Sequence, residues 1–152
     1  MSEVLFYHLT SSSLGQTLPG LMARTLDRGW RAVVQFGDPA ELPVMDDLLW
    51  TQGDGSFLPH GTDAPKDQPI YLTAQADNPG GAEVAFLVAG ARFDPAQAAS
   101  VQRTCLIFDA ANTDHMASAR EDWLKVKGGS GLTGTYWAQE DGSWVRKAST
   151  DG

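Results

Sequence analysis

The fold is decided near the amino terminus, by VLFYHLTSSSLGQTLPGLMARTLDRGWRAVVQF, residues 4–36. Residues 4–9 form an apolar and aromatic run that ends in polar residues, which is typical of a buried strand running into a loop. Apolar side chains then recur at helical spacing, with Pro19 near the start and Gly29 just past the end. This pattern predicts a helix about ten residues long, and residues 32–36 predict a second buried strand.

A second helix is expected to follow that strand. Asp38 can cap the helix and Pro39 can occupy its first position. The apolar side chains that would face the core recur three and four residues apart: Leu42, Met45 and Leu49. Trp50 is rotated about 80–100° away from that stripe. The order strand, helix, strand, helix predicts an α/β fold with a parallel sheet.

The rest of the chain extends the same architecture. Further strands are expected at residues 70–73, 83–88, 104–108, 135–138 and 143–146, the last two joined as a hairpin around Glu140-Asp141-Gly142. A helix is expected to begin at Asn112 or Thr113 and to run to about Lys127. No repeat or low-complexity linker divides the sequence, so residues 1–152 are expected to form one three-layer α/β domain, with a mostly parallel sheet flanked by helices.

Composition narrows the class of function. The chain has 42% hydrophobic residues and a net charge of −8, and all the excess acidity lies in residues 1–118. Nucleic-acid binding through phosphates needs clustered Lys and Arg, so any contact with nucleic acid is expected to be indirect. No apolar run is long enough for a membrane helix and no export signal is visible, which predicts a cytoplasmic protein without a membrane contact.

Signatures of catalysis are mostly missing. The Walker, Gly-x-Ser-x-Gly, His-Glu-x-x-His and Cys-x-x-Cys patterns are absent, and the histidines His8, His60 and His115 lie in different predicted elements. Residues 129–134 match Gly-x-Gly-x-x-Gly, but a helix precedes them and a strand follows, the reverse of the dinucleotide-binding order. No catalytic residue, cofactor or metal is therefore expected. Cys105 in an apolar strand is expected to be inert, and the acidic pairs Asp46-Asp47 and Glu121-Asp122 to be solvated.

Two aromatic groups suggest recognition rather than catalysis. Trp50 and Phe57 flank a glycine turn; they are either core residues or, if exposed, a surface for a protein partner. On the helix ending near Lys127, Arg120 and Lys127 share a stripe, and Trp123 lies between that stripe and the core face. An aromatic floor with cationic rims suits an acidic peptide with a free carboxylate. The alternative is a solvated helix edge with a packed tryptophan.

These residues resemble the chi subunit family of bacterial DNA polymerase III, a component of the clamp-loader assembly. The matching segments occur in family order: Phe6-Tyr7-His8-Leu9, Leu48-Leu49-Trp50, Ser56-Phe57-Leu58-Pro59-His60-Gly61, Ala119-Arg120-Glu121-x-Trp123, and Gly131-Leu132 through Tyr136-Trp137-Ala138-Gln139 to Gly142-Ser143-Trp144. The resemblance implies an α/β fold like that of mononucleotide-binding domains, without a phosphate loop.

The resemblance also implies a non-catalytic bridging subunit in DNA replication. Trp50 and Phe57 match the family's surface for the psi subunit or a helicase. Arg120, Trp123 and Lys127 match its pocket for the acidic C-terminal tail of single-stranded-DNA-binding protein. Asp122 and Leu124 stand where the family commonly has cations, so the tail is expected to bind more weakly or to use other cations, such as Lys125, Arg146 or Lys147. The competing hypothesis is a small-molecule or nucleotide-binding α/β enzyme that uses the crevice at the strand ends.

Overall fold

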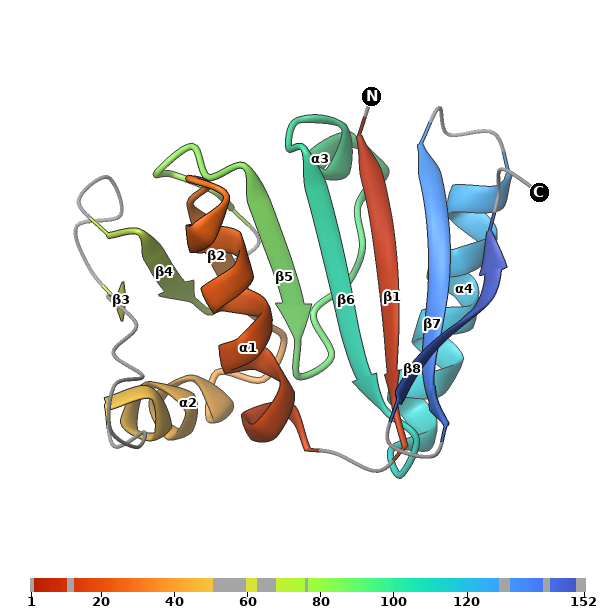
Figure 1. Ribbon diagram of the computed structural model, residues 1–152, viewed down its shortest axis with the longest axis horizontal. Helices are drawn as coiled ribbons and strands as arrows, with labels where there is room; N and C mark the ends of the chain where they lie inside the picture. Colours follow the sequence, from red (N-terminus) through yellow and green to blue (C-terminus); the bar gives the residue numbers. More distant parts are fainter. Residues whose placement is uncertain are drawn as a thin grey trace.

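A mostly parallel sheet forms the middle layer of the protein (Figure 1). The computed structural model describes residues 2–10, 13–50, 60–62, 68–75, 77–128, 132–140 and 143–149. The strands within them are β1 (Glu3–Leu9), β2 (Ala32–Phe36), β3 (His60–Gly61), β4 (Ile70–Thr73), β5 (Val84–Val88), β6 (Arg103–Asp109), β7 (Thr133–Glu140) and β8 (Ser143–Ser149). They are ordered β3-β4-β2-β5-β6-β1-β7-β8, and every neighbouring pair is parallel except β7 and β8.

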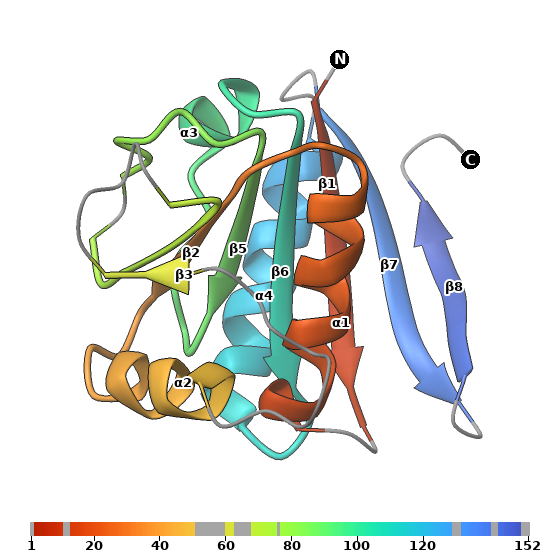
Figure 2. The same cartoon turned by 60° about the vertical axis from the view of Figure 1, so that its left-hand side comes forward.

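Helices cover both faces of this sheet (Figures 1 and 2). Helices α1 (Leu14–Asp27) and α2 (Glu41–Trp50) pack on one face, and α3 (Pro95–Ala99) and α4 (Thr113–Lys127) pack on the other. The predicted three-layer α/β architecture and the C-terminal hairpin are therefore confirmed. None of the described helices is long and apolar enough to cross a membrane.

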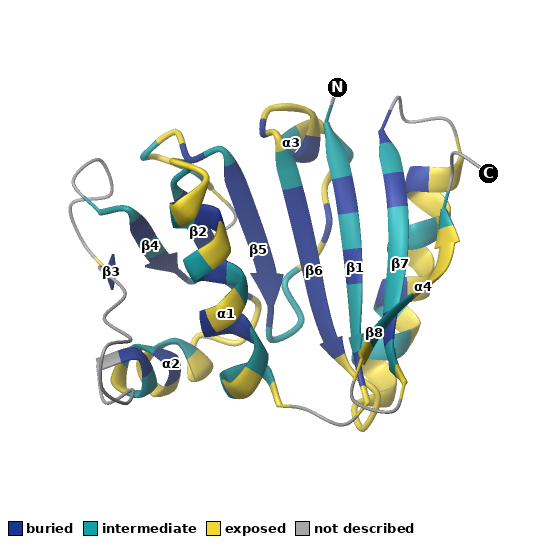
Figure 3. Cartoon of the chain, in the orientation of Figure 1, coloured by how far each residue is buried: buried dark blue, intermediate teal, exposed yellow. Residues whose placement is uncertain are grey.

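The hydrophobic core has two halves, one on each face of the sheet. Side chains of successive strand residues point to opposite faces, so in β1 Val4 and Phe6 join the α4 half while Leu5 and Tyr7 face α1. Strands β5 and β6 are buried along almost their whole length, whereas β1 and β7 contain both buried and half-buried residues (Figure 3). Burial of one large apolar side chain contributes about 1.5–3 kcal/mol, so the central strands hold the layers together.

The predicted strands agree with the structure, but helix α1 is longer than the predicted ten residues or so, and helix α2 begins later than predicted. Helix α1 begins well before Pro19, because Ser13 and Gln16 form a capping box that satisfies the free amides of the first turn. Helix α2 begins at Glu41 rather than at Pro39, because the Asp38 carboxylate accepts the Ala40 amide in a turn that precedes the helix. The short elements α3 and β3 were not predicted.

Candidate functional site

Helix α4 presents a buried stripe and an exposed stripe, as the spacing of its residues predicts. Asn112 caps the helix by accepting the His115 amide hydrogen, which confirms the predicted start. Ala119 and Val126 are 3% and 2% exposed and pack on the sheet, whereas Arg120 and Lys127 are exposed. The helix therefore shows solvent a cationic stripe beside its core face.

Trp123 lies between these two stripes and is half-buried. Its ring meets Phe6 of β1 edge-on at a centroid distance of 5.3 Å and meets Tyr136 of β7 edge-on at 6.0 Å. Phe6 and Tyr136 are themselves stacked, 6.3 Å apart. Edge-to-face pairs of this kind are favourable beyond the area they bury, so the three rings support one another. We call the surface formed by Arg120, Trp123, Lys127 and Tyr136 the α4 seam.

Tyr136 connects the α4 seam to a polar side chain of β1, His8. The Tyr136 hydroxyl lies 3.1 Å from Nδ1 of His8, whose ring stacks on Phe108. Burial raises the pKa of Tyr136, and the nearby positive charge of Arg120 partly offsets that increase. Burial lowers the pKa of His8, so the neutral form of the ring that contacts the Tyr136 hydroxyl is favoured. The seam thus has a neutral aromatic floor below a charged rim.

The cations of the α4 seam have no internal counter-charge. Neither Arg120 nor Lys127 forms an ion pair with any residue that the structure describes. Charged side chains on a solvated helix face are often unpaired, but here they border a half-buried tryptophan. A ligand that carries a carboxylate and an apolar side chain can therefore contact both groups at once.

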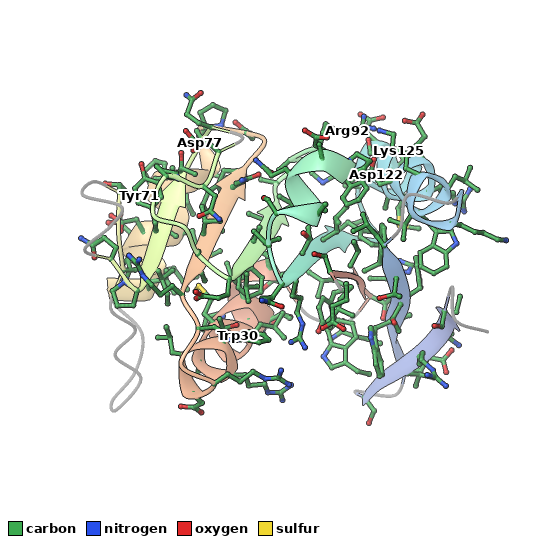
Figure 4. The ribbon with its side chains drawn as sticks, turned by 90° about the horizontal axis from the view of Figure 1, so that it is seen from above. Trp30, Tyr71, Asp77, Arg92, Asp122 and Lys125 are labelled. Carbon is green, nitrogen blue, oxygen red and sulfur yellow. The ribbon has the colours of Figure 1, made fainter. Side chains whose placement is uncertain are left out.

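A network of ion pairs lies on the other side of α4. The prediction that the Glu121-Asp122 pair is solvated is wrong for Asp122, which is buried in this network. The Asp122 side chain is 1% exposed and lies 3.3 Å from Nη2 of Arg92 and 3.5 Å from Nζ of Lys125 (Figure 4). Arg92 also contacts Glu121, at 3.2 Å. The hydrogen bond to Glu121 and the charge of Asp122 raise the pKa of Arg92. Burial of this carboxylate is tolerated because two cations approach it.

This network decides which cations can serve the α4 seam. At about 100° per residue, Lys125 lies about 140° around α4 from Arg120. Lys125 is also engaged by Asp122, and Lys147 of β8 is engaged by Glu140. Neither lysine is therefore free to replace the cations that the resemblance described above implies at the positions of Asp122 and Leu124. The Leu124 side chain is 63% exposed and lies next to the Arg120 stripe.

The second predicted surface, Trp50 and Phe57, lies outside what the structure describes. The backbone of α2 reaches Trp50, but the Trp50 side chain and all of Phe57 are beyond the described parts of the chain. What precedes them agrees with the predicted inward stripe, because Met45 and Leu49 are 6% and 2% exposed. Nε2 of the buried His60 lies 3.1 Å from Asp46 and joins β3 to α2.

The histidines and the cysteine of the described residues lie on different elements of the fold. His8, His60 and His115 lie on β1, β3 and α4, and the described residues contain no cluster of three potential metal ligands. Cys105 is buried in β6, where desolvation raises the pKa of its thiol to about 12. A thiol with such a pKa is not a nucleophile at neutral pH. The burial of Cys105 and its raised pKa agree with the predicted inert thiol.

A pocket of about 550 Å³ does exist at the carboxyl ends of the strands, where the competing enzyme hypothesis places a ligand. Its charged walls are acidic, formed by Asp38, Glu41 and Asp109. Asp38 and Asp109 accept backbone amide hydrogens in their own turns, and Asn112 already caps α4. Such a pocket repels phosphate, so its chemistry does not favour a nucleotide.

Comparison with known proteins places the chain in a family. The family model described as DNA polymerase III chi subunit, HolC, matches residues 1–132. The chain is also 25% identical over 91 residues to a protein of Rickettsia prowazekii named probable DNA polymerase III subunit chi. That alignment covers 58% of this chain and 55% of the relative, so the chain spans about half the length of the curated relative it matches. Because the family model covers most of its residues, the chain belongs to the DNA polymerase III chi subunit family.

Proposed function

We propose that this chain is a non-catalytic accessory subunit that links the DNA polymerase III clamp loader to single-stranded-DNA-binding protein during replication. In this proposal the α4 seam binds the acidic C-terminal tail of single-stranded-DNA-binding protein. A second surface, around Trp50 and Phe57, binds the psi subunit or a helicase. Membership of the chi subunit family supports the role in replication.

The observation that carries the proposal is the pairing of unpartnered cations with a half-buried aromatic ring. Arg120 and Lys127 have no carboxylate partner among the described residues, and Trp123 lies beside their stripe, toward the core face of the helix. An arginine forms two parallel hydrogen bonds with a carboxylate, and tryptophan provides a large rigid contact. An acidic tail that ends in an apolar residue and a free carboxylate complements both features.

Binding would proceed by electrostatic capture followed by apolar insertion. Arg120 and Lys127 attract the acidic residues and the terminal carboxylate, and the last apolar side chain of the tail then packs on Trp123. Since the cations are exposed, water and salt screen them, and each ion pair contributes no more than about 1 kcal/mol. A single tail therefore binds weakly, and several tails on one DNA-bound assembly hold the subunit through multivalency.

The surface for psi rests on the sequence of the segment that follows α2. Trp50 is the last residue of that helix, and Phe57 follows in the sequence after Gly53 and Gly55. Large aromatic side chains dominate the binding free energy of most protein interfaces. A Trp50→Ala variant is therefore expected to lose psi without losing the tail, and loss of both together would contradict the assignment of two separate surfaces.

Titration of a fluorescent tail peptide tests the central part of the proposal. The peptide copies the C-terminus of single-stranded-DNA-binding protein, and a matched peptide lacks only the final residue. Both are titrated into the wild-type chain and into Arg120→Gln at low and moderate salt. The proposal predicts saturable binding that requires the final residue, weakens with salt and decreases in the variant. Absence of saturable binding at low salt, or equal binding of the two peptides, would contradict it.

A further inference from the structure

A second cationic groove lies on the opposite face of the sheet from the α4 seam. It has a volume of about 440 Å³ and runs between α1 and strands β1 and β6. Arg24 and Arg28 come from the end of α1, and Arg103 is the first residue of β6. In Figure 4 Trp30, which follows α1, is seen on the opposite side of the sheet from Arg92 and Asp122.

Two of the three arginines, Arg28 and Arg103, lie against the same aromatic ring. The guanidinium carbon of Arg28 is 5.1 Å from the centroid of the Trp30 ring, and that of Arg103 is 5.4 Å from the same centroid. The sum of the two distances, about 10.5 Å, is an upper limit for the separation of these two guanidinium carbons. Like charges at this distance repel, and cation–π contacts with Trp30 offset part of the repulsion.

The carboxylates around the groove leave two of the arginines unpaired. Arg103 pairs with Glu3, the residue beside it on β1. Asp27 lines the groove but forms no ion pair with Arg24 or Arg28. Arg24 and Arg28 therefore have no carboxylate partner in the described parts of the chain.

The floor of the groove is apolar and has one free polar group. Leu21, Phe86 and Cys105 line it, and Tyr7 lies among them. The Tyr7 hydroxyl forms no hydrogen bond with any described residue. Burial raises the pKa of this hydroxyl, so it remains a neutral donor at every physiological pH. The groove thus offers two unpaired guanidinium groups, a hydroxyl donor and an apolar base.

The volume of the groove, its unpaired arginines and its apolar floor together indicate which class of ligand it can bind. A single phosphate or sulfate ion would leave most of a groove of about 440 Å³, and its apolar floor, unfilled. A nucleic acid would bring its phosphates close to Glu3 and Asp27 and to a chain with a net charge of −8. A peptide places single carboxylates between apolar side chains, and this spacing matches unpaired arginines above an apolar floor.

We propose that the groove lined by Arg24, Arg28, Arg103 and Tyr7 binds an acidic segment of a protein partner, separately from the α4 seam. A carboxylate of the segment pairs with Arg24 and Arg28, a neighbouring apolar side chain packs on the half-buried Leu21, and the Tyr7 hydroxyl donates a hydrogen bond to the segment. Because the groove and the α4 seam lie on opposite faces of the sheet, both can be occupied together. The inference does not depend on the proposed function.

The test uses the full chain and a defined probe. The probe is a fluorescein-labelled peptide, Asp-Glu-Phe-Asp-Glu-Leu-Asp-Glu, whose end is amidated so that it has no terminal carboxylate for the α4 seam. It is titrated by fluorescence anisotropy at low salt into wild type, the double variant Arg24→Gln with Arg28→Gln, and the matched double variant Arg120→Gln with Lys127→Gln. All four residues are exposed, so the substitutions preserve the fold.

The proposal predicts saturable binding that is weakened roughly tenfold by the α1 variant and by less than about twofold by the α4 variant. A peptide with Asn and Gln in place of Asp and Glu is expected not to bind. Binding that depends on α4 instead, or no saturable binding at low salt, would overturn the proposal. A single-stranded oligonucleotide that binds more tightly than the peptide, with the same dependence on Arg24 and Arg28, would overturn the choice of ligand.

Discussion

The two sides of helix α4 carry similar numbers of charges but differ in how those charges are satisfied. On one side Arg92 and Lys125 converge on the buried carboxylate of Asp122, so that the charges are neutralised within the protein. On the other side Arg120 and Lys127 flank Trp123 and have no partner among the described residues. The first side anchors the helix, and the second is available to a ligand.

The pairing of charges, rather than their number, therefore distinguishes the structural side of α4 from its binding side. A buried carboxylate without its cations would cost several kcal/mol, so the Asp122 side cannot release Lys125 to a ligand without loss. Exposed arginine and lysine side chains can bind an acidic peptide at little cost to the fold. Substitutions on the two sides are therefore expected to separate stability from binding.

Truncation of Trp123 is expected to have the largest effect, because this residue belongs to both the core and the α4 seam. Trp123→Ala removes ring contacts with Phe6 and Tyr136. The ring is only half-buried, so the free energy of unfolding should fall by about 2–3 kcal/mol. Urea unfolding measures this loss, and tail binding should disappear. Trp123→Phe is the matched control and should keep most of the stability; equal losses in the two variants would show that the ring contacts are unimportant.

Removal of the buried carboxylate is expected to have the next largest effect, on stability alone. Asp122→Ala leaves Arg92 and Lys125 without their shared partner. Since both cations remain partly in water, the free energy of unfolding should fall by about 1–2 kcal/mol rather than by the larger cost of a fully buried pair. Thermal or urea unfolding checks the value. A variant as stable as wild type would mean that the network does not anchor α4.

A new cation beside the Arg120 stripe is expected to increase the affinity of the α4 seam for the tail peptide. Leu124 is 63% exposed and lies about 40° around the helix from Arg120. Leu124→Lys should increase affinity for the tail peptide about twofold at low salt, or a few tenths of a kcal/mol, and the increase should vanish at high salt. Peptide titration at both salt concentrations measures it. An increase that persists at high salt would argue against an electrostatic origin.

The smallest expected effect concerns pH. Burial lowers the pKa of His8 below its ordinary value of 6.5, so the folded protein binds its proton less readily than the unfolded chain does. Stability is therefore full above about pH 6.5 and decreases as the pH falls below that value toward the lowered pKa. The loss should be the smallest of the expected effects, because solvent screens part of the shift. His8→Gln should remove this part of the pH dependence; urea midpoints that change equally in both proteins would contradict the assignment.

Most of the fold could be predicted from the sequence, because the apolar runs and capping residues that define its strands and helices are local patterns. Strands β2 and β4 are continuous apolar runs between turn residues, and the predicted bounds agree with the structure. The start of α4 was predicted from the capping preference of Asn112. Helix α1 has 14 residues rather than about ten, because the Ser13 capping box starts it before Pro19. The predicted start of α2 at Pro39 is wrong, because Asp38 and Ala40 form a turn ahead of the helix.

The site could be predicted only where its residues share one helix. The order of Arg120, Trp123 and Lys127 around α4 follows from a rotation of about 100° per residue. The burial of Asp122 could not be predicted, because Arg92 reaches it from the loop after β5. The groove on the α1 face was missed for the same reason: Arg24 and Arg103 are far apart in the sequence and meet only in the folded sheet.

A paired comparison of Arg120→Gln and Lys125→Gln tests whether α4 has separate structural and binding sides, because each variant removes one cation from a different side of the helix. Tail-peptide affinity is measured by titration, and the free energy of unfolding by urea denaturation. The account predicts that Arg120→Gln weakens binding about fivefold without loss of stability, and that Lys125→Gln lowers stability by up to about 1 kcal/mol without loss of binding. Equal loss of binding in both variants, or a greater loss in Lys125→Gln, would contradict the division of α4 into a structural side and a binding side.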